Sequence, residues 1–157
     1  MMTETTLHFA PEGKEDPYPV SMSRVKAALA KLQPQPDLSC VADEGGTVQV
    51  GDRTYSISFF GRRDYLSVRS NWDPDPQSSA RSLFRAVNSW NRFRHFPTAY
   101  VDRKKDDSFT VVADMVIHCR HGLSDLQLDE EVAHAIPCCA QAIDYVQWAY
   151  EQMQSDQ

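Results

Sequence analysis

Apolar side chains near the start of the chain recur at the spacing of one helical face and predict a first helix. They are Val25, Ala28, Leu29 and Leu32, which lie three or four positions apart. Ser21 precedes them as a good N-cap, and Val20 can pack on Val25 as a hydrophobic staple. Pro34 and Pro36 then end the helix, because proline disfavours helical geometry in the residue before it.

The next segments alternate between apolar and polar residues, as half-buried strands do. Residues 38–42 are expected to be short and extended. Strands at 47–50 and 53–60 flank Gly51-Asp52, a two-residue hairpin signal with glycine first. A third strand is expected over residues 64–72, so this part of the chain predicts an antiparallel meander.

A central amphipathic helix follows the meander. Asp75 is expected to cap it, with Pro76 in the first helical position, where a missing N–H costs little. The apolar face carries Ala80, Leu83, Phe84, Val87 and either Trp90 or Asn91. Pro97 requires the helix to stop before it.

Residues 88–101 form the junction between the two halves of the chain. Trp90 is its largest apolar group, and a buried indole N–H needs a hydrogen-bond acceptor. Asn91 can both donate and accept, which suits the end of a helix, where carbonyls lack partners. After Pro97 a strand is expected over 98–103, in which Tyr100 faces away from Ala99 and Val101. We therefore interpret Trp90, Asn91, Pro97 and Tyr100 as a structural junction.

The second hairpin pairs residues 98–103 with a strand at 108–118. One face of this strand is apolar, with Phe109, Val111, Ala113, Met115 and Ile117. The other face presents Val112, Asp114 and Val116. A sheet face open to water is usually polar, so the two valines predict that a partner or further cover lies on this side.

The last helix begins after Ser124, which forms a capping box with Gln127, while Leu123 can staple to Leu128. Apolar residues keep helical spacing from Leu128 to Tyr150. Pro137 interrupts this pattern, so we expect a kink or two abutting helices there.

The order of elements is therefore α-β-β-β-α-β-β-α, which predicts an α+β fold with helices packed on an antiparallel sheet. Residues 1–19 are polar and contain three prolines, and they are expected to form a flexible N-terminal arm. Residues 20–153 are expected to form a single domain, and residues 154–157 a short tail.

Composition places the chain among ordinary cytoplasmic proteins. Hydrophobic residues make up 41% and charged residues 24% of 157 residues. No apolar run reaches the length of a membrane span, and no signal peptide is evident. The net charge of −6 gives no reason to expect a nucleic acid or an anionic membrane as partner. The four cysteines form no CxxC pair and are expected to pack as small hydrophobes.

Several of these residues together resemble a known family. They are Trp90-Asn91, Pro97, Ala99-Tyr100-Val101, Asp114, His121-Gly122-Leu123-Ser124 and Leu128. With this order of elements, the chain resembles the YbjN-domain family of sensory transduction regulators, whose fold is similar to that of type III secretion chaperones. The resemblance spans about residues 20–153, although the hairpin at 104–108 lacks the glycine common in the family. It implies no catalytic residues, and the related chaperones are homodimers that bind extended segments of partner proteins.

One cluster could form a metal or nucleophilic site. His118, Cys119 and His121 lie together at the end of a strand, and His134, Cys138 and Cys139 could approach from the last helix. Zinc needs three or four converging ligands, and no paired ligand motif supports these. A reactive cysteine would need a neighbour that lowers its pKa. We prefer the interpretation in which the histidines lie at the surface and Cys119 is packed, while one of the adjacent cysteines is buried and the other peripheral.

The segment at residues 92–96 interleaves basic and aromatic side chains, as proteins that bind single-stranded nucleic acid do. Arg92 and Arg94 would carry that function. In the alternative, both cations complement the helix dipole, and Phe93 and Phe96 close the core.

The sequence therefore favours a non-enzymatic, cytoplasmic protein-binding or regulatory module without cofactor or metal. The expected partner is another protein, or a second copy of the chain in a homodimer. The strand that carries Val112, Asp114 and Val116 is expected to contact this partner. The alternatives are a metal-dependent sensor or enzyme using His118, Cys119 and His121, and a nucleic-acid-binding protein using Arg92 and Arg94.

Overall fold

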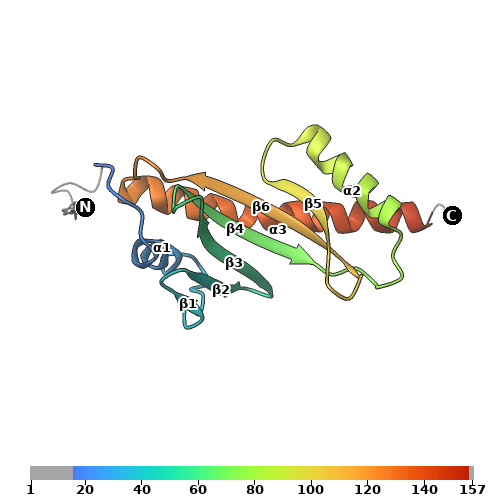
Figure 1. The fold of residues 1–157 in the computed structure, drawn as a ribbon, viewed down its shortest axis with the longest axis horizontal. Helices are drawn as coiled ribbons and strands as arrows, with labels where there is room; N and C mark the ends of the chain where they lie inside the picture. The colour runs from blue at the N-terminus through green and yellow to red at the C-terminus, as the bar shows by residue number, and fades with distance from the viewer. Residues whose placement is uncertain (1–15, 156–157) are drawn as a thin grey trace, which may run out of the picture.

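A computed structural model describes residues 16–155 as one antiparallel sheet with helices on one of its faces (Figure 1). The helices are α1 (Met22–Leu29), α2 (Ala80–Phe93) and α3 (Asp125–Ser155). The strands are β1 (Val41–Ala42), β2 (Gly45–Val50), β3 (Arg53–Phe60), β4 (Tyr65–Trp72), β5 (Thr98–Arg103) and β6 (Phe109–His118). The predicted α+β class is confirmed, with the short β1 added ahead of the meander.

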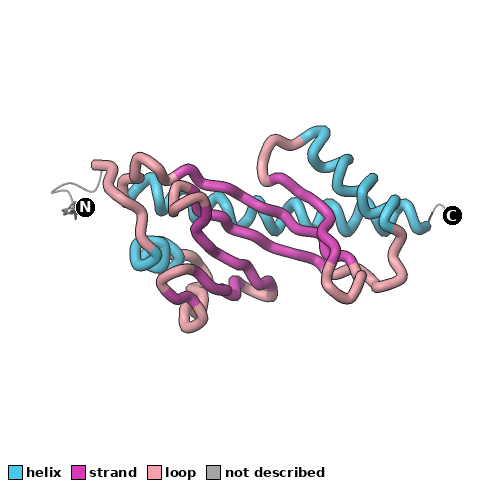
Figure 2. Tube along the Cα trace, viewed as in Figure 1, coloured by secondary structure: helices cyan, strands magenta, loops and turns pink. Residues whose placement is uncertain are grey.

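The sheet has the strand order β1-β2-β3-β4-β6-β5, and every neighbouring pair is antiparallel. The last hairpin therefore joins the meander through β6, which pairs with β4, and β5 becomes an outer strand. In Figure 2 the strands form a layer in front of α3. The figure thus looks onto the face of the sheet that α3 does not cover.

The core lies between this sheet and α3. Its fully buried side chains include Leu66 and Val68 of β4, Val111 of β6, and Leu128 and Ile143 of α3. α1 and α2 also contact α3. The apolar residues at helical spacing in α3 therefore pack against the alternating apolar residues of the strands in one layer, as the sequence predicts.

α3 is one continuous helix through Pro137, so of the two alternatives, a kink or two abutting helices, the second is wrong and a kink stays a prediction. Pro137 lies on the exposed side of the helix, while Ala135, Ile136 and Cys139 are buried. The missing N–H therefore lies on the solvent side, away from the packed face. The buried face extends over many turns, so its packing holds the helix together across the proline.

The start of α2 also differs from the prediction. Its N-cap is Ser79, whose hydroxyl accepts a bond from the N–H of Ser82, so the helix does not begin at Asp75 and Pro76. The Asp75 carboxylate instead accepts from the N–H of Gln77 within a preceding turn. At α1 the predicted cap is confirmed, because Ser21 accepts from the N–H of Arg24.

The expected arm at 1–19 falls mainly on residues 1–15, which lie outside the described part of the chain. Of the expected tail, residues 154 and 155 belong to α3, and 156–157 lie outside the description. Among residues 16–155, no helix is both long and apolar enough to cross a membrane.

Candidate functional site

Trp90 connects the end of α2 to the start of β5. Its side chain is 3% exposed, and its indole N–H donates to the carbonyl of Pro97 at 2.9 Å. Its ring packs on Tyr145 of α3 with centroids 5.6 Å apart. The ring of Trp90 thus packs on α3 while its N–H binds the backbone ahead of β5. These contacts hold together the two segments on either side of the turn between α2 and β5.

Asn91 completes this junction by pairing with the outer edge of β5. Its amide donates to the carbonyl of Ala99 at 2.8 Å, and its oxygen accepts the N–H of Ala99 at 3.0 Å. Residues of an antiparallel strand alternately direct both backbone groups toward the neighbouring strand or away from it. Ala99 directs them away from β6, so the amide occupies a position that an added strand would use.

The face of the sheet opposite α3 is not covered by that helix (Figure 2), and we call it the open face. Its residues follow from the strand register. They are Gly45, Thr47, Gln49, Thr54, Ser56, Ser58, Phe60, Tyr65, Ser67, Arg69, Asn71, Thr98, Tyr100, Asp102, Thr110, Val112, Asp114, Val116 and His118.

Asp114 lies near the centre of the open face in a network of polar contacts. Its carboxylate accepts from the Ser67 hydroxyl at 2.6 Å and from Nε of Arg69 at 2.8 Å. Only 11% of the Asp114 side chain is exposed. All these groups come from the adjacent strands β4 and β6, so the network holds the arginine in a set orientation above the sheet.

Tyr100 is half-buried on the same face and lies opposite Val112 in the β5–β6 register. Burial raises the pKa of the Tyr100 phenol. Tyr100, Val112, Arg69 and Asn71 help to line a depression of about 220 Å³. The open face therefore has a depression at this point, lined mainly by polar side chains.

Exposed apolar groups gather at one end of the open face. Phe60 is 43%, Tyr65 37% and Val116 45% exposed. The rings of Phe60 and Tyr65 stack with centroids 5.1 Å apart, and Tyr65 stacks on His118 at 5.2 Å. Val112, by contrast, is only 9% exposed. Of the two valines expected to face a partner, Val116 is the accessible one.

His118, Cys119 and His121 lie close in sequence but do not form a ligand set. The two imidazoles have centroids 6.1 Å apart, and Cys119 points inward, 5% exposed, with its thiol donating to the carbonyl of Ile117. No group of three or more metal-ligating side chains converges anywhere within residues 16–155. Burial raises the pKa of the Cys119 thiol, which disfavours the reactive thiolate.

The adjacent cysteines of α3 divide as expected. Cys139 is fully buried, and burial raises its pKa to about 12. Cys138 is partly exposed and lies 3.4 Å from Nε2 of His134, yet burial also raises the pKa of its thiol. Neither thiol has the lowered pKa of a nucleophile.

Arg92 and Arg94 are both exposed at the end of α2. Arg92 lies over the ring of Phe93 at 5.4 Å. Phe93 is 72% and Phe96 67% exposed, so the expectation that they close the core is wrong. Trp90 is the last buried residue of α2, and both phenyl rings follow it in the sequence and are exposed.

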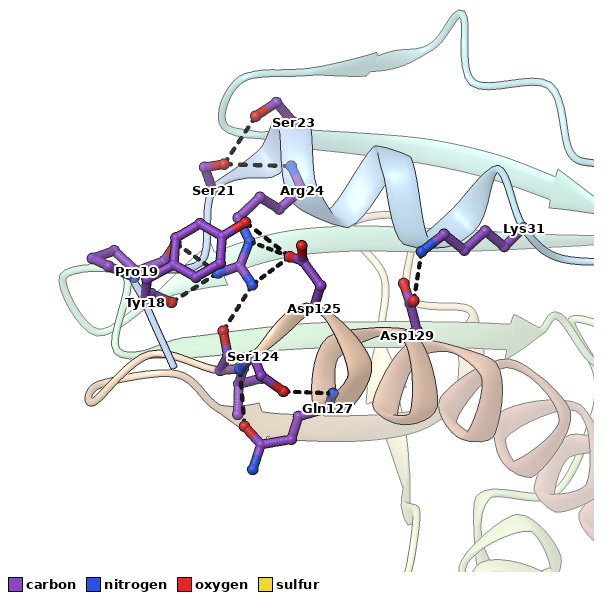
Figure 3. Close-up of polar contacts among 11 residues, drawn as sticks. Tyr18, Pro19, Ser21, Ser23, Arg24, Lys31, Ser124, Asp125, Gln127 and Asp129 are labelled. Atoms are coloured by element: carbon purple, nitrogen blue, oxygen red, sulfur yellow. Dashed lines mark hydrogen bonds and ion pairs between the residues drawn. The ribbon is translucent and has the colours of Figure 1, made fainter. Parts of the chain in front are cut away.

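A cluster that the sequence did not predict joins the start of α1 to the start of α3 (Figure 3). Arg24 donates to the carbonyls of Tyr18, Pro19 and Leu123 at 2.7–2.8 Å. Its Nη2 and Nε also donate to the Asp125 carboxylate, at 2.8 and 3.2 Å. One guanidinium thus connects three segments of the chain.

Tyr18 completes this cluster. Its hydroxyl donates to Asp125 at 2.9 Å, its ring lies 3.5 Å from the Arg24 guanidinium, and its backbone pairs with Leu123. Gly122, with φ of +77°, lies so close that an added Cβ would be 2.6 Å from the Tyr18 backbone. The contacts join residues about a hundred positions apart, so no local pattern could have revealed them.

The fold and its open face together define a small α+β protein with a single sheet and helices on one side. The sequence profile of the YbjN family, described as "Putative bacterial sensory transduction regulator", matches residues 21–148. The chain belongs to the YbjN family.

Two solved structures are similar to this one. The crystal structure of YbjN from E. coli, "a putative transcription regulator", has a TM-score of 0.66 at 13% identity, covering 82% of this chain and 92% of that one. The HopA1–SchA chaperone–effector complex has a TM-score of 0.48 at 16% identity, covering 80% and 99%. At such identities the likeness to E. coli YbjN shows the fold alone. A comparison with curated proteins finds no match.

Proposed function

We propose that this chain is a cytoplasmic, non-enzymatic regulatory module that binds another protein through the open face of its sheet. The observation that carries the proposal is the exposed apolar end of that face, formed by Phe60, Tyr65 and Val116. Three large apolar groups side by side are a typical feature of interaction surfaces. The family's description as a regulator supports the same role.

The Arg69–Asp114 pair supports the proposal from the centre of the face. Nε of Arg69 is bound to Asp114, while no hydrogen bond within residues 16–155 involves its two η nitrogens. Two oriented N–H donor groups beside this depression can bind the polar groups of a partner polypeptide. Asp114 then positions Arg69, and Val116 supplies apolar contact.

The partner can be a second copy of the chain, and a homodimer is part of this proposal. An isologous contact through the open face would bring Phe60, Tyr65 and Val116 of the two copies together. Such a contact buries apolar surface, and the Arg69–Asp114 pair offers both charges for complementary contacts.

The test is the replacement Val116→Lys, which places a charge on the exposed apolar end without disturbing the core. Leu126→Lys is the matched control, because Leu126 is 52% exposed on α3, away from the open face. We expect the wild type and the control to form a dimer in light scattering, or to retain the same protein from a lysate. Val116→Lys should lose that partner. A monomer whose captured proteins are unchanged by Val116→Lys would contradict the proposal.

A further inference from the structure

The solvent face of α2 carries a straight row of arginines. Arg81, Arg85 and Arg92 stand at relative positions i, i+4 and i+11, which lie on one side of a helix. All three are exposed, and they lie opposite the buried face formed by Leu83, Ala86, Val87 and Trp90. At 1.5 Å per residue the row spans about 16 Å. We call it the arginine row.

The segment that contains the arginine row carries no acidic residue. Residues 77–101 contain four arginines and neither aspartate nor glutamate, which gives this segment a charge of +4. Since the whole chain has −6, the remainder carries −6 − 4 = −10. None of the salt bridges among residues 16–155 uses an arginine of this segment. An acidic protein thus has one strongly basic helix.

The stability of α2 does not explain this arrangement. Arg81 lies in the first turn, which contains no acidic residue, and there a cation opposes the helix dipole. Arg81 and Arg85 are like charges at i, i+4, which destabilise a helix. A surface helix that only needs solubility would interleave both signs. The row therefore points to an anionic ligand.

Exposed aromatic rings accompany the row and define the ligand further. Phe84 is 51%, Phe93 72% and Phe96 67% exposed, and Arg92 lies over Phe93. α2 lies beyond β5, at the upper right of Figure 1. Guanidinium groups that bind phosphates, together with phenyl rings that stack on bases, are what single-stranded nucleic acid requires.

We propose that α2 and residues 94–96 bind single-stranded nucleic acid. Arg81, Arg85 and Arg92 hold successive phosphates, while Phe93 and Phe96 stack on unpaired bases. A duplex hides the faces of its bases and leaves the phenyl rings without a role. A second copy docked symmetrically on this helix would place like charges together, which disfavours the row as a dimer contact.

The test is fluorescence anisotropy of the full chain with a labelled oligo(dT) of about 20 nucleotides. About three phosphate contacts predict that binding weakens about 100-fold when salt rises from about 20 to about 200 mM. The triple variant Arg81→Gln, Arg85→Gln, Arg92→Gln should lose about tenfold or more in affinity. The double variant Phe93→Ala, Phe96→Ala should bind more weakly while keeping the salt dependence.

The control is Arg62→Gln, Lys105→Gln, Arg120→Gln, which removes the same charge from exposed positions outside α2. It should bind within about twofold of the wild type if the row itself, and not net charge, attracts the phosphates. Absence of binding at low salt, equal loss in both triple variants, or equal affinity for a duplex of the same length would each overturn the proposal. So would binding of polyglutamate in place of the oligonucleotide. Val116→Lys should leave oligonucleotide binding unchanged, so this proposal and the proposed function fail separately.

Discussion

At the scale of single residues, Trp90 and Asn91 are sequence neighbours that satisfy different backbone groups of the segment after α2. The indole binds the carbonyl of Pro97, and the amide binds both groups of Ala99. The size of tryptophan and the dual chemistry of asparagine are local properties, so the sequence alone could single out these two residues. Which carbonyl each one binds depends on the path of the backbone, which the sequence does not show.

Replacing Trp90 by alanine should destabilise the fold by about 3–5 kcal/mol, because it removes a buried aromatic group and leaves a cavity. It also leaves the Pro97 carbonyl without its donor. Urea denaturation measures the change. Trp148→Ala is the matched control, since Trp148 is 55% exposed, and it should cost much less. Equal losses in the two variants would contradict the role given to Trp90.

The Arg24 cluster should make stability depend on pH in the acid range. Hydrogen bonds from Arg24, and then from Tyr18, lower the pKa of Asp125 below its ordinary value. A carboxylate with a lowered folded-state pKa stabilises the protein above its unfolded pKa of about 4. That contribution is lost as pH falls through the folded-state value.

The change should be small, because the Asp125 side chain is 41% exposed and water screens the pair. Thermal melts between about pH 6 and pH 3 should show a smaller acid-induced decrease in Asp125→Asn than in the wild type. A variant with the full wild-type decrease would show that other carboxylates cause it.

At the scale of elements, the sequence predicted periodic segments well and their ends less well. Alternating apolar residues located β3, β4 and β6, since one face of each strand meets the core. The start of α2 was wrong because two capping signals stand four residues apart, and Ser79 takes the role given to Asp75. Likewise, α3 passes through Pro137 because its long buried face outweighs one missing hydrogen bond.

Pro137→Ala should therefore stabilise the protein, by about 1–3 kcal/mol. Alanine restores an N–H that can donate to the carbonyl of residue 133, and it favours helical geometry. Pro137 is exposed, so little packing is lost. Chemical denaturation of this variant should be compared with Pro76→Ala, a change in the loop before α2 that should have little effect. A less stable Pro137→Ala would show that the proline ring itself contributes to packing.

At the scale of the whole molecule, the sequence predicted the layers but neither the contacts between distant segments nor the distribution of charge. The Arg24 cluster joins α1 to α3 across about a hundred positions, and only the closed fold brings them together. The net charge of −6 gave no reason to expect nucleic acid as partner. That total conceals the charge of +4 on residues 77–101, of which α2 presents three arginines on one side.

This uneven charge has a practical consequence for purification. A protein with an isoelectric point of about 5.3 should flow through a cation-exchange column at neutral pH. A resin bead, however, contacts only one side of a bound molecule. The outer side of α2 offers it three guanidinium groups that form no salt bridge within residues 16–155. The chain should therefore adsorb to sulfonate beads at low ionic strength, in the orientation that turns its acidic remainder toward the buffer.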